Sequence, residues 1–326
     1  MNDHITYNPE THKQPALVAD IGGTNARFAL CRNGILDETS IQVLACNDYE
    51  NLDNAVKQYL SDQNTTATAA CMAFASPVGE CVSMTNNHWT FNCTEMQHKL
   101  SLSSFKVIND FTAQALALPA LQKEELIKIG VGEANEHAAK LIIGPGTGLG
   151  VAGLKEVNDH WLPLPGEGGH AAFSAVTQQD TDVLNHLQSE ADFVSWEDVL
   201  CGSGLERLYR AHSALSGEHN SLKDFEITTS ALQEEGIARQ TLLHFCELLG
   251  RAASNSALVM GAQGGVYIAG GIIPRFPEFF AESRFRHSFD KNNKMVDYLK
   301  DIPTYLVVAD NPGLVGACQA LDNPLV

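Results

Sequence analysis

The sequence predicts an α/β protein of two domains, and three observations support this. The chain has 326 residues, which is more than one ordinary hydrophobic core accommodates. Short apolar runs, typical of buried strands, alternate with longer runs at helical spacing. The arrangement of a strand, a glycine-rich turn and a second strand occurs twice, which indicates two related halves.

Composition narrows the functional classes. The chain has 39 Asp and Glu against 21 Lys and Arg, a formal net charge of -18, which disfavours general nucleic-acid binding. A nucleotide ligand remains compatible, because backbone N–H groups and Mg²⁺ can neutralise phosphates locally. The eight cysteines form no C-x-x-C pair, so we expect reduced, mostly buried thiols of a cytoplasmic protein. No apolar run is long enough to span a membrane.

The first glycine turn follows a predicted disordered tail over residues 1–15. Pro15–Ile21 and Ala26–Cys31 read as strands, and Gly22–Asn25 joins them as a hairpin. A hairpin argues against a Rossmann start, where the glycines would lead into a helix. Two adjacent glycines let the backbone approach a phosphate closely, and Asp20 at the strand end is placed to meet Mg²⁺ through water. The alternative is a plain hairpin turn.

The next segments are less specific. Asp48–Tyr59 has helical spacing, with Asn47 or Asp48 as its cap, and Ala67–Ala75 reads as a strand. Met84–Trp89 is polar and aromatic, which suits a sugar-facing loop and equally a surface loop.

The strongest catalytic candidate follows the apolar run Phe105–Ile108. Asn109 and Asp110 come directly after this predicted strand, and a helix-forming run then continues to Pro119. Polar groups at the C-terminal end of a buried strand are a usual place for the chemistry of an α/β enzyme. We interpret Asp110 as a catalytic base and Asn109 as a contact for a polyhydroxyl substrate. The alternative is a simple helix N-cap, which favours both residue types.

A second glycine turn, Gly144–Gly150, lies between the predicted strands Ala139–Ile143 and Val151–Leu154. The spacing fails the G-x-G-x-x-G pattern, because Leu149 stands where the third glycine belongs. It also fails the P-loop pattern, because the chain has no Gly-Lys pair. The sequence therefore predicts a second hairpin turn shaped to receive phosphate.

The loop Leu164–His170 has almost no side chains apart from Glu167 and His170. Three flanking glycines allow a ligand to approach closely, so we interpret this stretch as a binding loop. A metal site is the weaker alternative, because a third ligand is not nearby.

Helical spacing predicts four further helices. They are Thr177–Glu190, Val194–Leu200, Leu205–Leu215 and Ile237–Ala262. In the second of these, Ser195 would be the N-cap and Glu197 an ordinary acidic residue of the first turn.

The C-terminal part contains a third glycine pair. Gly270-Gly271 follows the predicted strand Val266–Ala269. Pro303–Ala309 reads as the last strand, and Asn311 begins the closing helix with proline at its first position. The simplest ligand for three glycine turns is a nucleoside triphosphate held between two lobes. The chemistry would then be phosphoryl transfer to a hydroxyl group, with Asp110 as the base.

At this point the chain resembles bacterial glucokinases, specifically the Gram-negative and cyanobacterial type. The resemblance extends from about residue 16 to the end and rests on five motifs in the same order: Asp20–Thr24, Ile108–Thr112, Gly146–Gly150, Leu164–His170 and Ala269–Gly271. The cysteine-rich zinc motif of the related repressor/ORF/kinase family is missing, so no metal site is assigned to the cysteines.

This resemblance implies an actin-like ATPase (ribonuclease H-like) fold of two α/β lobes around a cleft. The smaller lobe would hold 16–120 and 311–326, and the larger lobe 121–310. The implied activity is ATP-dependent phosphorylation of the 6-hydroxyl of glucose with Mg²⁺, the first step of glycolysis, by a cytoplasmic homodimer. The implied glucose contacts are Asn109, Asp110, Glu167, His170 and Glu197. The implied ATP contacts are Asp20, Gly22, Gly23, Thr24, Asn25, Gly146, Thr147, Gly148, Gly270 and Gly271, with Asp20 also meeting hydrated Mg²⁺.

Three rival interpretations stay open at this stage. A sugar-binding sensor or repressor on the same fold would need a DNA-reading module, which the short tail before Pro15 does not supply. An actin-like ATPase of chaperone or filament type would leave Asn109 and the Gly166–His170 loop without a role. A kinase of mannose, fructose or an amino sugar would keep the mechanism and change the substrate.

Overall fold

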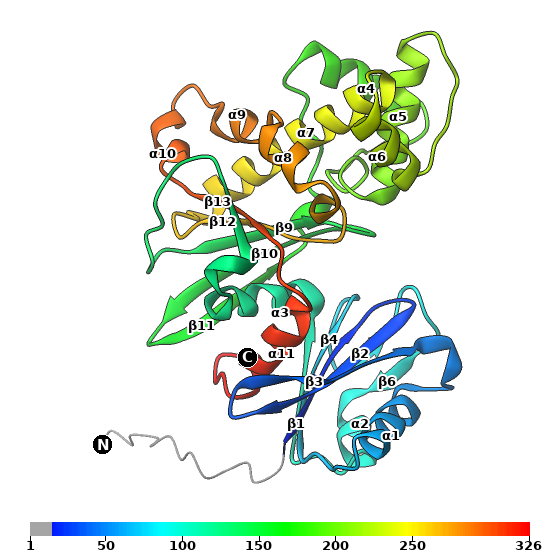
Figure 1. Cartoon of the computed structure of the whole chain (residues 1–326), viewed down its shortest axis with the longest axis vertical. Helices are drawn as coiled ribbons and strands as arrows, with labels where there is room; N and C mark the ends of the chain where they lie inside the picture. The colour runs from blue at the N-terminus through cyan, green and yellow to red at the C-terminus, as the bar shows by residue number, and fades with distance from the viewer. Residues whose placement is uncertain (1–14) are drawn as a thin grey trace. The chain divides into compact units, whose positions relative to one another are not determined.

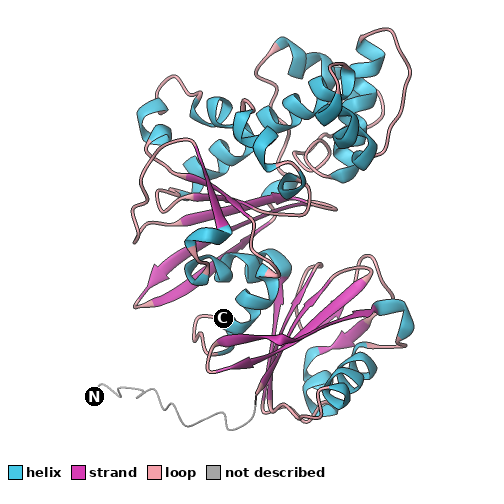
Figure 2. Cartoon of the chain, viewed as in Figure 1, coloured by secondary structure: helices cyan, strands magenta, loops and turns pink. Residues whose placement is uncertain are grey.

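The computed structural model describes residues 15–326 and confirms an α/β protein (Figures 1 and 2). Most of the predicted tail, residues 1–14, lies outside the described residues. The chain forms two compact units. The smaller unit contains the described residues up to Ala120, together with His160–Pro163 and Asp310–Val326, and the larger unit contains Leu121–Asp159 and Leu164–Ala309.

The smaller unit is built on a five-stranded sheet in the order β3-β2-β1-β4-β7. Its strands are β1 Ala16–Ile21, β2 Asn25–Arg32, β3 Ile35–Ala45, β4 Ala69–Phe74 and β7 Ser104–Asn109. β1 pairs antiparallel with β2, which confirms the first predicted hairpin, and parallel with β4. A separate two-stranded sheet pairs β5 (Cys81–Ser83) with β6 (Thr90–Asn92).

Helices cover the five-stranded sheet on both faces. Leu17, Ala19 and Ile21 of β1 share a hydrophobic core with α1 (Leu52–Asp62) and α2 (Cys93–Lys99). Because alternate residues of a strand point to opposite faces, Asp20 points to the other face. The C-terminal helix α11 (Pro312–Leu321) packs on that face and contacts β1 and β4. The Asp20 side chain is therefore enclosed by residues from the two ends of the chain.

The closest helix contact of the smaller unit joins α11 to α3 (Asp110–Ala117), which lie side by side in Figure 1. A Cβ atom at Gly316 would overlap the carbonyl oxygen of Ala113. Glycine is therefore required at this point of α11, and the contact fixes the helix that begins at Asp110.

The position of residues 160–163 differs from the predicted division of the chain, which assigned them to the larger lobe. They belong to the smaller unit, where the side-chain amide of Asn323 donates to the carbonyl oxygen of Trp161 at 2.6 Å. The Lys106 ammonium also donates to the carbonyl oxygens of Ala320 and Asn323. The C-terminal end of the chain, from Ala320 of α11 to Asn323, is thus bonded at several points within the smaller unit.

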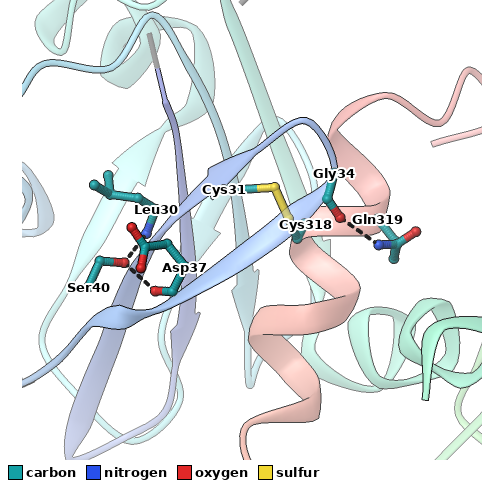
Figure 3. Close-up of a disulfide and its surroundings, with 7 residues drawn as sticks. All are labelled: Leu30, Cys31, Gly34, Asp37, Ser40, Cys318 and Gln319. Carbon is teal, nitrogen blue, oxygen red and sulfur yellow. Dashed lines mark hydrogen bonds between the residues drawn. A yellow bond between two sulfur atoms is a disulfide. The ribbon is translucent and has the colours of Figure 1, made fainter. Parts of the chain in front are cut away.

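A disulfide joins Cys31 of β2 to Cys318 of α11 (Figure 3). Their Cα atoms lie 5.8 Å apart, within the usual range for a disulfide. Beside it, the Gln319 side chain donates to the carbonyl oxygen of Gly34 at 3.0 Å. The prediction that all cysteines are reduced thiols is therefore wrong for this pair. The two residues are 287 positions apart, so spacing gave no indication of the bond.

The disulfide predicts a specific thiol count. Protein purified without reductant and then denatured should react with a thiol reagent at six cysteines, because the other two are bonded. The Cys318→Ser variant, treated in the same way, should expose Cys31 as one further thiol. Reduction of the wild-type protein should also destabilise the smaller unit, by about 2–5 kcal/mol for so long a closed loop. Reaction of all eight cysteines without reductant would contradict the bond.

The larger unit contains a six-stranded sheet in the order β11-β10-β9-β12-β13-β8. Its strands are β8 Leu126–Ile129, β9 Lys140–Pro145, β10 Leu149–Val157, β11 His160–Gly166, β12 Val266–Ile268 and β13 Thr304–Val307, and of β11 only the part from Leu164 belongs to this unit. β9 and β10 pair antiparallel, which confirms the second predicted hairpin. β12 pairs parallel with β9, so the ends of these two strands lie at the same edge of the sheet.

The helices of this unit include the predicted long core helix, α7, which packs against α5, α6 and α9. They are α4 Gln178–Gln188, α5 Gly202–Leu215, α6 Asp224–Gln233, α7 Ile237–Met260, α8 Pro277–Glu282, α9 Phe285–Asp290 and α10 Val296–Lys300. A fully buried Asp180 ties α4 to α7 by accepting hydrogen bonds from His244 and Arg251. Within residues 15–326, no helix combines the length and apolarity needed to cross a membrane.

Candidate active site

Asn109 and Asp110 stand where β7 ends and α3 begins. Asn109 is the N-cap of α3, and its side-chain oxygen accepts from the N–H groups of Phe111 at 2.9 Å and Thr112 at 3.3 Å. The cap interpretation is thus correct for Asn109. The amide NH₂ group of this residue also bonds to the Asp110 side chain, and its second hydrogen can donate to a ligand. Asp110 accepts from the same Phe111 N–H at 2.9 Å, which orients its carboxyl group.

Asp110 has a strongly perturbed acidity. Burial raises its pKa to about 6, and the neighbouring Asp20 carboxyl adds to the rise, while the hydrogen bond from Phe111 opposes it. Burial also raises the pKa of Asp20, against the effect of Arg27, its partner on β2. Gly313 of α11 packs closely against Asp20, because a Cβ atom at Gly313 would lie 2.8 Å from the carboxyl carbon of Asp20. The two acids therefore form a shielded pair of carboxyl groups in the smaller unit.

The first glycine turn is closed by its own hydrogen bond and contacted by a neighbouring loop. The N–H of Gly22 donates to the carbonyl oxygen of Asn25 at 3.0 Å and closes the turn. The side-chain amide of Asn87 donates to the carbonyl oxygen of Gly22 at 3.2 Å. A Cβ at Gly23 would lie 2.5 Å from the Cβ of Asn86. The polar loop that contains Asn86 and Asn87 thus packs on the turn, a contact that nothing in the local sequence indicates.

The second and third glycine turns lie together at one edge of the larger unit's sheet. The N–H of Gly146 donates to the carbonyl oxygen of Gly148 at 2.8 Å, which closes the turn around Thr147. Gly270 has a positive φ of 81° and stands so close to Pro145 that a Cβ would overlap its carbonyl oxygen. Gly271 has open space on its Cβ side. The structure therefore brings together two of the turns predicted to bind nucleotide.

Glu167, His170 and Glu197 form a second cluster in the larger unit. Nε2 of His170 lies 3.9 Å from Glu167, and its Nδ1 lies 3.9 Å from Oε1 of Glu197. Glu167 and His170 are exposed, whereas Glu197 is half-buried. An acid on each side of an imidazole gives acceptors and a donor within reach of one ligand, which suits several hydroxyl groups.

The predicted helix over 194–200 does not form, because other hydrogen bonds take its place. The Asp198 carboxylate accepts hydrogen bonds from the N–H and the hydroxyl group of Ser195, and the Ser195 hydroxyl oxygen accepts from the N–H of Asp198. These bonds make a tight turn. Glu197 is therefore not an ordinary first-turn acid of a helix. Its Oε2 accepts from the N–H of Leu149 at 2.7 Å, next to the second glycine turn.

The candidate residues divide between the two units. Among the residues that the structure describes, no group of three His, Cys, Asp or Glu side chains could hold a metal ion by itself. The smaller unit holds Asp20, Gly22, Gly23, Thr24, Asn25, Asn109 and Asp110, and the larger unit holds Gly146, Thr147, Gly148, Glu167, His170, Glu197, Gly270 and Gly271.

Comparison with known proteins gives a consistent result. The family model described as glucokinase matches residues 17–324. A glucokinase of Hahella chejuensis is 49% identical over 314 residues, which cover 95% of this chain and 98% of the relative. The crystal structure of a glucokinase from an Antarctic psychrotroph, 38% identical, matches with a TM-score of 0.87 over 95% of this chain and 99% of that one.

A more distant structure extends the fold comparison. A glucokinase from Balamuthia mandrillaris in complex with glucose is 20% identical and matches with a TM-score of 0.78, over 94% of this chain and 93% of that one. These likenesses confirm the actin-like ATPase fold expected from the sequence. The span matched by the family model includes every candidate residue from Asp20 to Gly271.

Proposed function

Since the chain belongs to the glucokinase family, whose members phosphorylate glucose with ATP, we propose that Asp110 is the general base of this reaction. The enzyme transfers the γ-phosphoryl group of ATP to glucose and forms glucose 6-phosphate and ADP. As the 6-hydroxyl oxygen of glucose attacks the phosphorus atom, the Asp110 carboxylate accepts the hydroxyl proton.

The raised pKa of Asp110 carries this assignment. A general base works best when its pKa lies near the working pH, because it is then both deprotonated and basic enough to take the proton. With a pKa of about 6, Asp110 is mostly a carboxylate at neutral pH. Its bond from the Phe111 N–H holds the carboxylate in a fixed orientation without neutralising it.

The proposed glucose contacts use the hydrogen-bonding capacity that local structure leaves. Asn109 has committed its side-chain oxygen to α3 and bonds to Asp110 through its NH₂ group, so the second NH₂ hydrogen would donate to a sugar oxygen. Glu197 has committed Oε2 to Leu149, so Oε1 would accept from a sugar hydroxyl, as would Glu167. His170 would donate or accept according to its tautomer. A site that pairs each hydroxyl discriminates against sugars that lack one.

The proposed ATP contacts are backbone groups of the glycine turns. The residues of the turns Gly22–Asn25, Gly146–Gly148 and Gly270–Gly271 are at least partly exposed, and phosphate oxygens and the nucleoside would bind there. Mg²⁺ commonly keeps several water ligands and binds through one or two carboxylates plus phosphates, so the Asp20 and Asp110 pair fits a hydrated ion. The ion would neutralise phosphate charge. Asp20 would orient its water ligands.

The family resemblance also supports three further proposals. We propose that the enzyme is a homodimer, that it works in the cytoplasm and that its reaction is the first step of glycolysis.

The proposed function is tested by measuring ADP release from Mg²⁺ATP with glucose, mannose, fructose, N-acetylglucosamine and no sugar. We expect release that depends on glucose and is much weaker with the other sugars. Faster release with mannose or fructose would keep Asp110 as the base and replace the substrate. ADP release without sugar would favour the ATPase interpretation, and glucose binding without any release would favour the sensor.

A further inference from the structure

The segment Val194–Gly202 is bonded to two loops of the larger unit that bind different substrates in the proposed function. On the side of the proposed sugar-binding loop, Gly166–His170 (the sugar loop), three backbone hydrogen bonds join the segment Val194–Gly202 to residues 169–173. The N–H of Glu197 donates to the carbonyl oxygen of Gly169 at 2.8 Å, and that of Trp196 to Ala171 at 2.9 Å. The N–H of Phe173 returns a bond to Val194 at 2.9 Å. The segment and residues 169–173 therefore lie side by side like two short antiparallel strands.

Toward the second glycine turn, the same segment makes two more hydrogen bonds. The N–H of Gly202 donates to the carbonyl oxygen of Gly146 at 2.9 Å. The N–H of Leu149 donates to Oε2 of Glu197 at 2.7 Å. A Cβ at Gly148 would overlap this same carboxylate oxygen, so a side chain there would displace the Glu197 carboxylate. Bonds at both ends of the turn thus depend on the position of the segment.

The segment is anchored firmly enough to transmit a displacement. Trp196 is only 5% exposed and packs edge-on against Phe173, with ring centroids 5.1 Å apart. Val199 and Leu200 are fully buried in the core of the larger unit. Close-packed side chains move together, so a shift on one side of the segment is felt on the other.

Glu197 is the residue that contacts both loops through its side chain. One carboxylate oxygen holds the Leu149 N–H, and the other lies 3.9 Å from His170 of the sugar loop. We propose that Glu197 is a positioning residue that couples glucose binding at Gly166–His170 to nucleotide binding at Gly146–Gly148. When a glucose hydroxyl binds Oε1, it restricts the carboxylate, and Oε2 then holds the turn in its phosphate-binding conformation.

This inference rests on the proposed function and adds a thermodynamic property to it. If glucose strengthens nucleotide binding by some factor through Glu197, the nucleotide must strengthen glucose binding by the same factor. The size of that factor is a measure of the link. Loss of a simple sugar contact would weaken glucose binding and leave the factor unchanged once glucose is saturating.

The coupling is tested by titrating a non-hydrolysable ATP analogue, adenylyl imidodiphosphate with Mg²⁺, by calorimetry without glucose and at saturating glucose. In the wild-type enzyme we expect glucose to lower the Kd of the analogue by roughly 5- to 150-fold, the usual range of such couplings. In Glu197→Ala this ratio should approach one. Glu197→Gln should restore much of it, because its amide oxygen can accept the Leu149 N–H.

Glu167→Ala is the matched control, because Glu167 belongs to the same proposed sugar contacts and its carboxylate pairs with His170 at 3.9 Å. It should weaken glucose binding and keep the wild-type ratio. A wild-type ratio of one, or an unchanged ratio in Glu197→Ala, would overturn the coupling while leaving the kinase activity standing. A wild-type protein that binds neither glucose nor the analogue would overturn both proposals.

A second measurement avoids any dependence on glucose affinity. Hydrogen exchange is followed in the peptide that contains residues 166–173, with and without the analogue alone. The analogue should slow exchange there in the wild-type enzyme and in Glu167→Ala, and have little effect in Glu197→Ala. Equal slowing in all three proteins would show that the link does not run through Glu197.

Discussion

An Asp110→Asn variant is expected to lose a factor of about 10² to 10⁴ in kcat while it still binds glucose. Asparagine keeps the size of the side chain and an oxygen that accepts from the Phe111 N–H at the start of α3. It cannot take the proton of the 6-hydroxyl. Steady-state rates of ADP release, together with glucose binding by calorimetry, separate the two effects. A variant with near wild-type turnover would remove Asp110 from the role of base.

The pH dependence of kcat/KM gives an independent test of Asp110 as the base. Because the folded-state pKa of Asp110 is about 6, kcat/KM should fall as the pH drops below 6, by about tenfold per pH unit once the carboxylate is protonated. Asp110→Asn should lack this acidic limb. An acidic limb that persists in the variant with the same midpoint would belong to another group.

Stability provides the control for folding. The pKa of Asp110 is higher in the folded protein, about 6, than its ordinary value of 3.8, so the folded state binds the proton more tightly. Its contribution to stability is therefore greatest below about pH 4 and is lost as the pH rises through 6. Asp110→Asn cannot ionise, so it should gain thermal stability relative to wild type at pH 8 and much less at pH 4. A less stable variant at pH 8 would point to a structural role for the carboxylate.

The second large effect is expected at the contact between α11 and α3. Gly316→Ala would normally favour a helix by about 1 kcal/mol, because alanine has the higher helix propensity. Here its Cβ would overlap the carbonyl oxygen of Ala113, and overpacking of this kind usually costs about 1–3 kcal/mol or more. Backbone atoms cannot turn aside as a flexible side chain can. We therefore expect net destabilisation of the smaller unit and a melting temperature lower by roughly 5–10 °C.

Gly79→Ala is the matched control for Gly316→Ala. It lies in the same unit, its nearest contact would be the carbonyl oxygen of Cys81 at 3.9 Å, and its φ is not in the positive range. It should leave the melting temperature almost unchanged. A Gly316→Ala protein as stable as Gly79→Ala would mean that α11 moves away from α3 without cost, and kcat would then show whether Asp110 has moved with α3.

The sequence predicted those parts of the fold that depend on neighbouring residues. The strands around Gly22–Asn25 and Gly146–Gly148 were predictable because each apolar run ends at its own turn residues. Asp110 was identifiable because a carboxylate directly after a buried strand is a local pattern. Its raised pKa was not, since it arises from burial and from Asp20, ninety positions earlier in the chain.

The errors share one physical cause, which is bonding between distant segments. The helix predicted over 194–200 is absent because the N–H groups of Trp196 and Glu197 bond to Ala171 and Gly169, which leaves only a turn from Trp196 to Leu200. The bond between Cys31 and Cys318 likewise depends on α11 packing against the first sheet. Spacing along one sequence carries no information about such pairs, and the supporting role of Asn87 was missed for the same reason.

The contribution of α11 to the smaller unit has a consequence for how the protein is made. A ribosome synthesises the larger unit's residues, up to Ala309, before those of α11. The larger unit can therefore begin to fold before the smaller unit is complete, since domains generally fold as units. The strands before Ala120 must wait until Gly313 and Gly316 arrive to cover Asp20 and pack on Ala113. A chain that terminates before Asp310 should therefore keep a protease-resistant larger unit, lose its smaller unit to digestion and have no kinase activity.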